Sequence, residues 1–126
     1  MNLMRDAIIQ SAVSEPLVSN GSGQQQFRFA ANFPGFSGHF PGYPVLPAVL
    51  QTLLAQMLSE QMVGRSLRLK VLQQAKFTRQ IRPGDLIHVD VQGRQQEEFY
   101  RCQAVLRVDG ETAAQFVLLL EEGSVA

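Results

Sequence analysis

His39 is the residue whose type and setting best suit chemistry. It lies in the segment from Phe33 to Pro47, which holds four prolines and three glycines. Such a segment restricts the backbone, and a histidine held there suits a general acid or base. Pro47 fits the first turn of a helix, where unpaired N–H groups and the positive end of the dipole can hold a carbonyl oxygen. With these donors, His39 could remove a proton beside a thioester carbonyl. On the residues alone, however, a structural histidine that bonds loop carbonyls is favoured over a catalytic one.

The helix that would supply these donors is predicted to run from Pro47 to about Met62 and to stop near Gly64. Its apolar residues recur every three or four positions and form one broad face. They are Val49, Leu50, Leu53, Leu54, Met57, Leu58 and Met62. A helix this apolar needs an apolar cover, which the rest of the chain must provide.

That cover is predicted to be a sheet. Gln24 to Asn32 alternates apolar with polar residues and indicates a strand, and several more alternating runs follow the helix. A turn is expected at Arg82 to Asp85, and Asp109-Gly110 is a strong hairpin signal. One helix followed by an antiparallel meander predicts an α+β domain, in which a curled sheet wraps around the helix.

Length and charge set further bounds. The 126 residues fit a single domain, 1–126, and the formal net charge of zero indicates neither nucleic acid nor membrane as a partner. Basic residues are nonetheless concentrated between Gln61 and Gly84, where no acidic residue occurs: Arg65, Arg68, Lys70, Lys76, Arg79 and Arg82. This stretch is either a solvated face balanced by acids elsewhere or a docking surface for an acidic partner.

The chain has one cysteine, Cys102, which rules out an intrachain disulfide and a thiolate metal cluster and is expected to be a buried thiol. No apolar stretch approaches the roughly 20 residues needed to cross a bilayer, so no membrane insertion is expected. Met1 to Gln10 lacks the pattern of a signal peptide, and a cytoplasmic protein is therefore expected. His88 alternates with apolar neighbours and is expected at the surface.

Two blocks of the sequence resemble one family. Gly38 to Pro47 reads GHFPGYPVLP, and Lys76 to Asp85 reads KFTRQIRPGD. Both resemble the recurring motifs of bacterial β-hydroxyacyl-acyl-carrier-protein dehydratases, which have the hot-dog fold. The resemblance implies a dimer whose two sheets join side by side, with the active site at the subunit boundary. It also implies an acyl carrier protein bearing the substrate on phosphopantetheine, and neither a metal nor a redox cofactor.

The resemblance also assigns roles. His39 matches the catalytic histidine, which removes the α-proton of a 3-hydroxyacyl thioester and helps to eliminate water. The backbone at Ala48 and Val49 matches the helix start that binds the thioester carbonyl, although the family usually has glycine in place of Ala48. The remaining substrate-binding residues implied by the match are Phe40, Gly42, Pro47 and Leu53.

The largest departure from the family is Leu53, which stands where the family has Glu or Asp, fourteen residues after the histidine. Leucine cannot protonate a leaving hydroxyl, and Glu60 is roughly 10 Å farther along the helix. Gln51 is the candidate substitute, because it can hydrogen-bond a hydroxyl even though it cannot transfer a proton. Glutamine here is similar, more loosely, to dehydratase-like proteins of aryl-polyene clusters. The alternative is that Gln51 is simply an exposed helix residue.

Three functions are consistent with these observations. The first is a 3-hydroxyacyl-thioester dehydratase using His39 with Gln51 or water, either as a homodimer or as half of a heterodimer whose other subunit brings the carboxylate. The second is a non-catalytic subunit that binds acyl carriers. The third is a thioesterase on the same fold.

Overall fold

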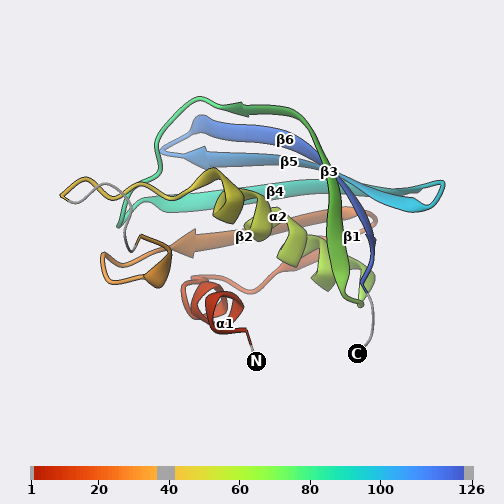
Figure 1. Ribbon diagram of the computed structural model, residues 1–126, viewed down its shortest axis with the longest axis horizontal. Helices are drawn as coiled ribbons and strands as arrows, with labels where there is room; N and C mark the ends of the chain where they lie inside the picture. Colours follow the sequence, from red (N-terminus) through yellow and green to blue (C-terminus); the bar gives the residue numbers. More distant parts are fainter. Residues whose placement is uncertain (1, 37–41, 124–126) are drawn as a thin grey trace.

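The computed structural model describes residues 2–36 and 42–123. Two α-helices, a short 3₁₀ turn and six strands follow one another along the chain (Figure 1). They are α1 (Leu3–Gln10), β1 (Leu17–Ser19), β2 (Ser22–Arg28), η1 (Pro34–Phe36), α2 (Ala48–Val63), β3 (Leu67–Phe77), β4 (Leu86–Gln96), β5 (Phe99–Val108) and β6 (Glu111–Glu122).

The six strands form one antiparallel sheet in the order β1-β2-β4-β5-β6-β3. The sheet curls around α2, which packs against its concave face, while α1 lies beside β2 (Figure 1). The predicted α+β hot-dog architecture, one central helix wrapped by a curled sheet, is therefore confirmed. Strands β1 and β3 are the two edges, and this leaves β3 paired only with β6 among the strands described.

Helix α2 begins and ends where its flanking residues predict. Pro47 is the N-cap, with a φ of −62°, and Gly64 ends the helix in the left-handed conformation that glycine adopts without strain. The helix buries Leu50, Leu54, Ala55 and Leu58 against the sheet, but Val49, expected on the apolar face, is 70% exposed. The apolar stripe is therefore narrower at the helix start than the sequence predicted.

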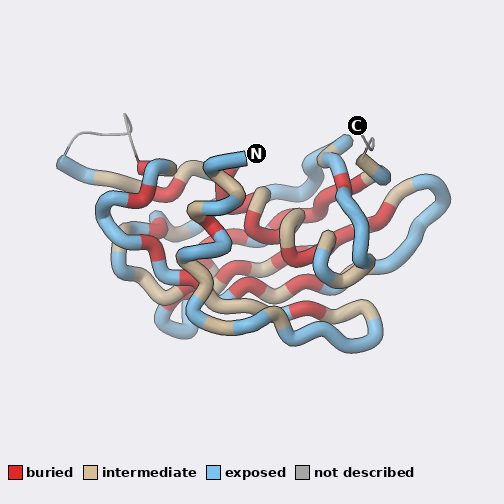
Figure 2. Tube along the Cα trace, turned by 90° about the horizontal axis from the view of Figure 1, so that it is seen from below, coloured by how far each residue is buried: buried red, intermediate tan, exposed pale blue. Residues whose placement is uncertain are grey.

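The core lies between α2 and the sheet, where buried residues of neighbouring strands gather (Figure 2). Strand β5 supplies its alternate residues from Tyr100 to Val108, as the pattern predicted, and Cys102 among them is fully buried. Strand β6 lies between β5 and β3 and buries Val117 as well as its neighbours Phe116 and Leu118.

Two local predictions are confirmed. Asp109-Gly110 joins β5 to β6 with positive φ at both residues, and Arg82 to Asp85 forms a turn in which the Asp85 carboxylate accepts from the Arg82 N–H at 2.8 Å. A further tight hairpin joins β1 to β2, with positive φ at Asn20 and Gly21.

Within 2–36 and 42–123, no helix is both long and apolar enough to cross a membrane.

Candidate functional site at the start of the central helix

An open cavity of about 330 Å³ lies at the N-terminal end of α2. One wall is the segment that leads into the helix together with its first turn, and the other is the chain that leaves β3. The lining residues are Val45, Leu46, Pro47, Ala48, Gln51, Phe77, Thr78, Arg79 and Gln80. The cavity therefore brings together residues from the two sequence blocks that resemble the dehydratase motifs.

The first turn of α2 offers backbone donors to this cavity. Pro47 has no N–H, and its carbonyl accepts from Leu50 at 3.0 Å and from Gln51 at 3.1 Å. Ala48 and Val49 are exposed, and no acceptor in the described part of the chain takes their N–H groups. These two groups at the positive end of the helix can bind a carbonyl oxygen.

Gln51 is buried rather than exposed, which corrects the alternative reading of this residue. Its side chain is 4% exposed, and its Nε2 donates to the carbonyl of Leu46 at 3.0 Å. The N–H of Leu46 in turn donates to the carbonyl of Ile81 at 2.7 Å. Gln51 is thus fixed to the backbone that connects the two walls of the cavity.

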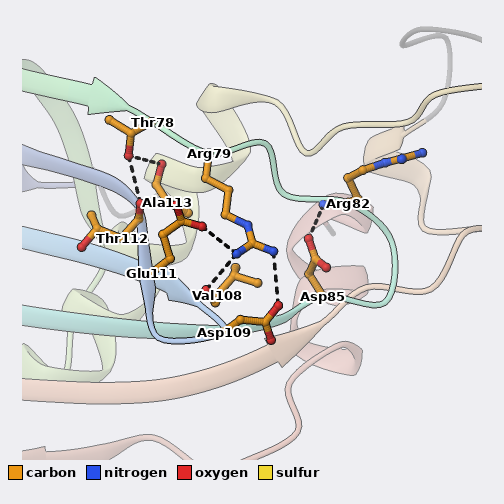
Figure 3. Close-up of polar contacts among 9 residues, drawn as sticks. All are labelled: Thr78, Arg79, Arg82, Asp85, Val108, Asp109, Glu111, Thr112 and Ala113. Carbon is orange, nitrogen blue, oxygen red and sulfur yellow. Dashed lines mark hydrogen bonds and ion pairs between the residues drawn. The ribbon is translucent and has the colours of Figure 1, made fainter.

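The wall formed by the end of β3 is tied to the β5–β6 hairpin (Figure 3). The Arg79 guanidinium donates to Glu111 Oε1 at 2.8 Å, to Asp109 Oδ2 at 3.3 Å and to the Val108 carbonyl at 3.2 Å. The hydrogen bond to Glu111 and then that to Asp109 raise the pKa of Arg79 against a lowering by burial. The Thr78 hydroxyl donates to the Thr112 carbonyl at 2.9 Å, so two successive residues fasten this wall.

Tyr43 links the segment that leads into α2 to the chain that leaves β3. Its hydroxyl donates to Gln80 Oε1 at 2.9 Å, and the Arg82 guanidinium carbon lies 3.8 Å from the centre of its ring. The aromatic ring, 42% exposed, is held from two sides at the surface. Both walls of the cavity are therefore anchored by specific contacts rather than by the core alone.

Of the predicted site residues, the structure brings Pro47, Ala48 and Gln51 together around the cavity. Val49 adjoins them on the helix but does not line the cavity, and Gly42, exposed with a φ of +80°, does not line it either. Leu53 is half-buried and packs against the core. His39 and Phe40 lie outside the described residues.

Sequence reasoning did not identify Thr78, Arg79 and Gln80 as lining residues of a site. These three residues belong to the second motif block, which begins at Lys76, but the sequence alone does not show which other segment of the chain they face. Glu60, the nearest acid along the helix, is engaged elsewhere, because it accepts from Arg5 at 2.5 Å and from the Leu67 N–H at 2.9 Å. Among the described lining residues of the cavity there is no carboxylate.

The fold and the site define a hot-dog protein with a cavity at the helix start, and comparisons with known proteins identify its family. The family model described as "ApeI dehydratase", of the ApeI-like family, matches residues 16–115. The chain therefore belongs to the ApeI-like dehydratase family. This finding confirms the predicted relation to the acyl-carrier-protein dehydratases and to the looser aryl-polyene type.

Curated relatives point the same way. The 3-hydroxyacyl-[acyl-carrier-protein] dehydratase FabZ of Rickettsia massiliae is 34% identical over 93 residues, which are 67% of this chain and 64% of that protein. The FabZ of Rickettsia bellii is 31% identical over 104 residues, which are 74% of this chain and 72% of that protein. Both relatives are named as 3-hydroxyacyl-[acyl-carrier-protein] dehydratases, and the match covers less than two thirds of the Rickettsia massiliae protein.

Solved structures confirm the fold. The dehydratase heterocomplex ApeI:P from Xenorhabdus doucetiae has a TM-score of 0.75 at 18% identity, covering 88% of this chain and 96% of that chain. A hypothetical thioesterase with coenzyme A from Streptococcus pneumoniae has a TM-score of 0.71 at 8% identity, covering 96% and 94%. At these identities the likeness shows a shared hot-dog fold.

Proposed function

We propose that this chain dehydrates 3-hydroxyacyl thioesters carried on an acyl carrier protein. The observation that carries the proposal is the family match over residues 16–115. The matched range includes both motif blocks, and each block contributes residues to one cavity at the start of α2. A phosphopantetheine arm is narrow and flexible, and the open cavity suits its thioester end. We propose that the protein acts in the cytoplasm.

In the proposed mechanism, the Ala48 and Val49 N–H groups bind the thioester carbonyl oxygen and stabilise the negative charge that develops on it. His39 removes the α-proton, the electron pair of that C–H bond forms the C2–C3 double bond, and the bond from C3 to the hydroxyl breaks. The departing hydroxyl takes a proton and leaves as water. The thioester itself stays intact. Phe40, Gly42, Pro47 and Leu53 complete the proposed substrate-binding set.

The proton for the leaving hydroxyl has no carboxylate source among the described residues that line the cavity. Two sources remain within the proposal: protonated His39, which has just taken the α-proton, or a carboxylic acid from a second hot-dog subunit. Loss of a general acid typically costs about 10²–10⁴-fold in rate. The chain is therefore expected to be slow alone and faster with a partner that supplies the acid.

We propose that the partner joins along β3. This edge strand leaves its outer side unpaired among the described strands, and it exposes Val71, Leu72 and Phe77, which are 38%, 43% and 40% exposed. A long edge strand with exposed apolar side chains is a template for another chain. Phe77 also lines the cavity, so a subunit on this edge would reach the proposed site. A second copy or a different hot-dog subunit both fit this edge.

The basic stretch supports the carrier as substrate. Arg68 pairs with Glu121, and Arg79 pairs with Glu111 and Asp109, which fits a balanced surface for these two residues. In the part of the chain that the structure describes, the other four basic residues enter no salt bridge: Arg65, Lys70, Lys76 and Arg82. Lys76 and Arg82 flank the residues that line the cavity, where an acidic carrier protein would dock.

A non-catalytic subunit that binds acyl carriers is the second candidate, and Leu53 together with the lack of a carboxylate in the described cavity lining favours it. Thioester hydrolysis is the third. It needs a group that activates water, and His39 is the candidate for that task.

Labelled water separates the three functions. The purified chain would be incubated with a 2-enoyl-acyl carrier protein in H₂¹⁸O, because a dehydratase also catalyses the reverse addition of water. Label at C3 of an intact thioester is the result expected here. Label in a released carboxylic acid would instead identify a thioesterase, and no label, with the carrier still bound, would identify a binding subunit.

A further inference from the structure

The orientation of the Gln51 amide is fixed by its neighbours. A backbone carbonyl can only accept a hydrogen bond, so the Gln51 atom that lies 3.0 Å from the Leu46 carbonyl oxygen must be the amide nitrogen. Leu46 cannot turn away easily, because its own N–H is held by the Ile81 carbonyl at 2.7 Å. The side chain therefore keeps its oxygen on the side opposite Leu46.

That oxygen, Oε1, is buried and has no hydrogen-bond donor in the described part of the chain. Buried polar atoms without a partner are rare in native proteins, since leaving one unpaired costs free energy. The side chain belongs to the lining of the cavity, at the first turn of α2. The missing donor is therefore expected to arrive with whatever occupies the cavity.

We infer that Gln51 Oε1 accepts a hydrogen bond from the bound ligand, and that this contact selects for ligands with a donor beside the thioester. The inference rests on the proposed function for the class of ligand. In that class two groups can donate: the hydroxyl at C3 of the acyl chain and the amide N–H of the pantetheine arm.

The direction of this hydrogen bond changes the role of Gln51. An acceptor cannot protonate the leaving hydroxyl, so Gln51 is a binding and specificity residue rather than a substitute for the acid. If it holds the hydroxyl hydrogen, the lone pairs of that oxygen are left for the group that donates the proton. Gln51 and the missing acid then perform different tasks.

The test measures binding of two slowly reacting ligands, the oxyester analogues of 3-hydroxybutyryl-pantetheine and butyryl-pantetheine, in which an oxygen replaces the thioester sulfur and adds no N–H donor. Calorimetry would compare the wild type with Gln51→Met, which keeps the length of the side chain and removes its oxygen. A loss of about 10-fold in affinity is expected for a ligand whose donor Gln51 accepts. Thr78→Val serves as the control, because the Thr78 hydroxyl already donates to the Thr112 carbonyl.

A loss confined to the hydroxyl ligand identifies the C3 hydroxyl as the donor. Because Gln51→Met also removes the hydrogen bond to Leu46, an equal loss for both ligands identifies the pantetheine amide only if either ligand also moves the ¹³C shift of the wild-type Gln51 amide carbon, and an equal loss without that movement overturns the inference. Unchanged affinity for both overturns the inference. Should the variant not fold, the ¹³C shift of the Gln51 amide carbon in the wild type reports the same contact. It is expected to move downfield on binding, and no movement overturns the inference. Because no turnover is needed, the result is independent of whether the chain proves to be a dehydratase.

Discussion

Leu53 lies half-buried on α2, where the dehydratase motif has a carboxylic acid. Gln51, half a turn earlier, donates to the Leu46 carbonyl and leaves its buried Oε1 as an acceptor without a donor among the described residues. At the scale of single residues, binding the ligand and protonating its leaving hydroxyl are thus separate tasks. Among its described residues, this chain offers a group for binding but no acid for the protonation.

Replacing Leu53 by glutamate is predicted to increase the rate of water loss from a 3-hydroxyacyl carrier protein by at least about 10-fold, because a positioned general acid contributes roughly 10²–10⁴-fold. The rate would be followed by mass spectrometry on the purified variant. Leu53→Gln is the control, because glutamine has the size of glutamate but cannot ionise, and this variant should stay near the wild-type rate. Equal rates for the two variants would contradict the assignment of this position.

Cys102 is fully buried, and its burial raises the pKa of the thiol to about 11 from its ordinary 9.0, against a smaller lowering by a hydrogen bond with Ser59. Native Cys102 is therefore predicted to react slowly with a disulfide reagent at pH 8 and rapidly in urea, which absorbance would show. The folded state holds the thiol proton more tightly than the unfolded state between about pH 9 and 11.

The free energy of unfolding should consequently fall across that pH range, and below it the ionisation of Cys102 should add no pH dependence. Urea denaturation of the wild type and Cys102→Ala checks this, since the difference between the two proteins removes other titrating groups. A difference that is independent of pH from 8 to about 11 would contradict the burial of this thiol.

At the scale of elements, the end of β3 is positioned by the Arg79 contacts with the β5–β6 hairpin (Figure 3). Arg79→Leu is predicted to accelerate hydrogen exchange of the backbone N–H groups at positions 78 and 79. Both groups donate to the Ala113 carbonyl, next to the contacts that the Arg79 side chain makes. Exchange measured by NMR at neutral pH checks it. Arg82→Leu, outside the cluster, is the control, and similar exchange in both variants would show that the cluster does not hold the wall.

The elements that the sequence predicted best are those with chemical signals at both ends. Pro47 and Gly64 bound α2, and Asp109-Gly110 marks a hairpin, so local conformation alone determines them. Helix α1 was not predicted, because eight residues are too short for a clear period and Asn2 is its only cap signal. Strand β3 breaks alternation at two register shifts that depend on pairing with β6.

The candidate site was predictable in part. The two motif blocks located the chain segments, but the contacts between them depend on how the helix start meets the end of β3. The burial of Gln51 is an example, since a glutamine in a first helical turn carries no signal for a bond to the preceding Leu46 carbonyl. Glu60 was correctly set aside, and its pairing with Arg5 became visible only once α1 was placed.

For the whole molecule, β3 is the sheet edge that we expect to meet a second subunit. Leu72→Lys is predicted to shift the protein toward the monomer without unfolding it, because a charge on an edge strand opposes pairing. Sedimentation velocity measures this. Val18→Lys on the opposite edge strand β1 is a matched control, since Val18 and Leu72 are both 43% exposed. A shift with Val18→Lys alone would place the interface on β1 instead.

The central claim is that this chain eliminates water from 3-hydroxyacyl thioesters and that His39 removes the proton. The most direct measurement follows loss of water from 3-hydroxybutyryl-acyl carrier protein by mass spectrometry, with the wild type, His39→Ala and His88→Ala side by side. His88 is an exposed histidine that contacts Gln26, and its loss should not matter. Water loss by the wild type and His88→Ala that disappears in His39→Ala is the predicted result. Equal activity in all three proteins, or none in the wild type with a hot-dog partner supplied, would contradict it.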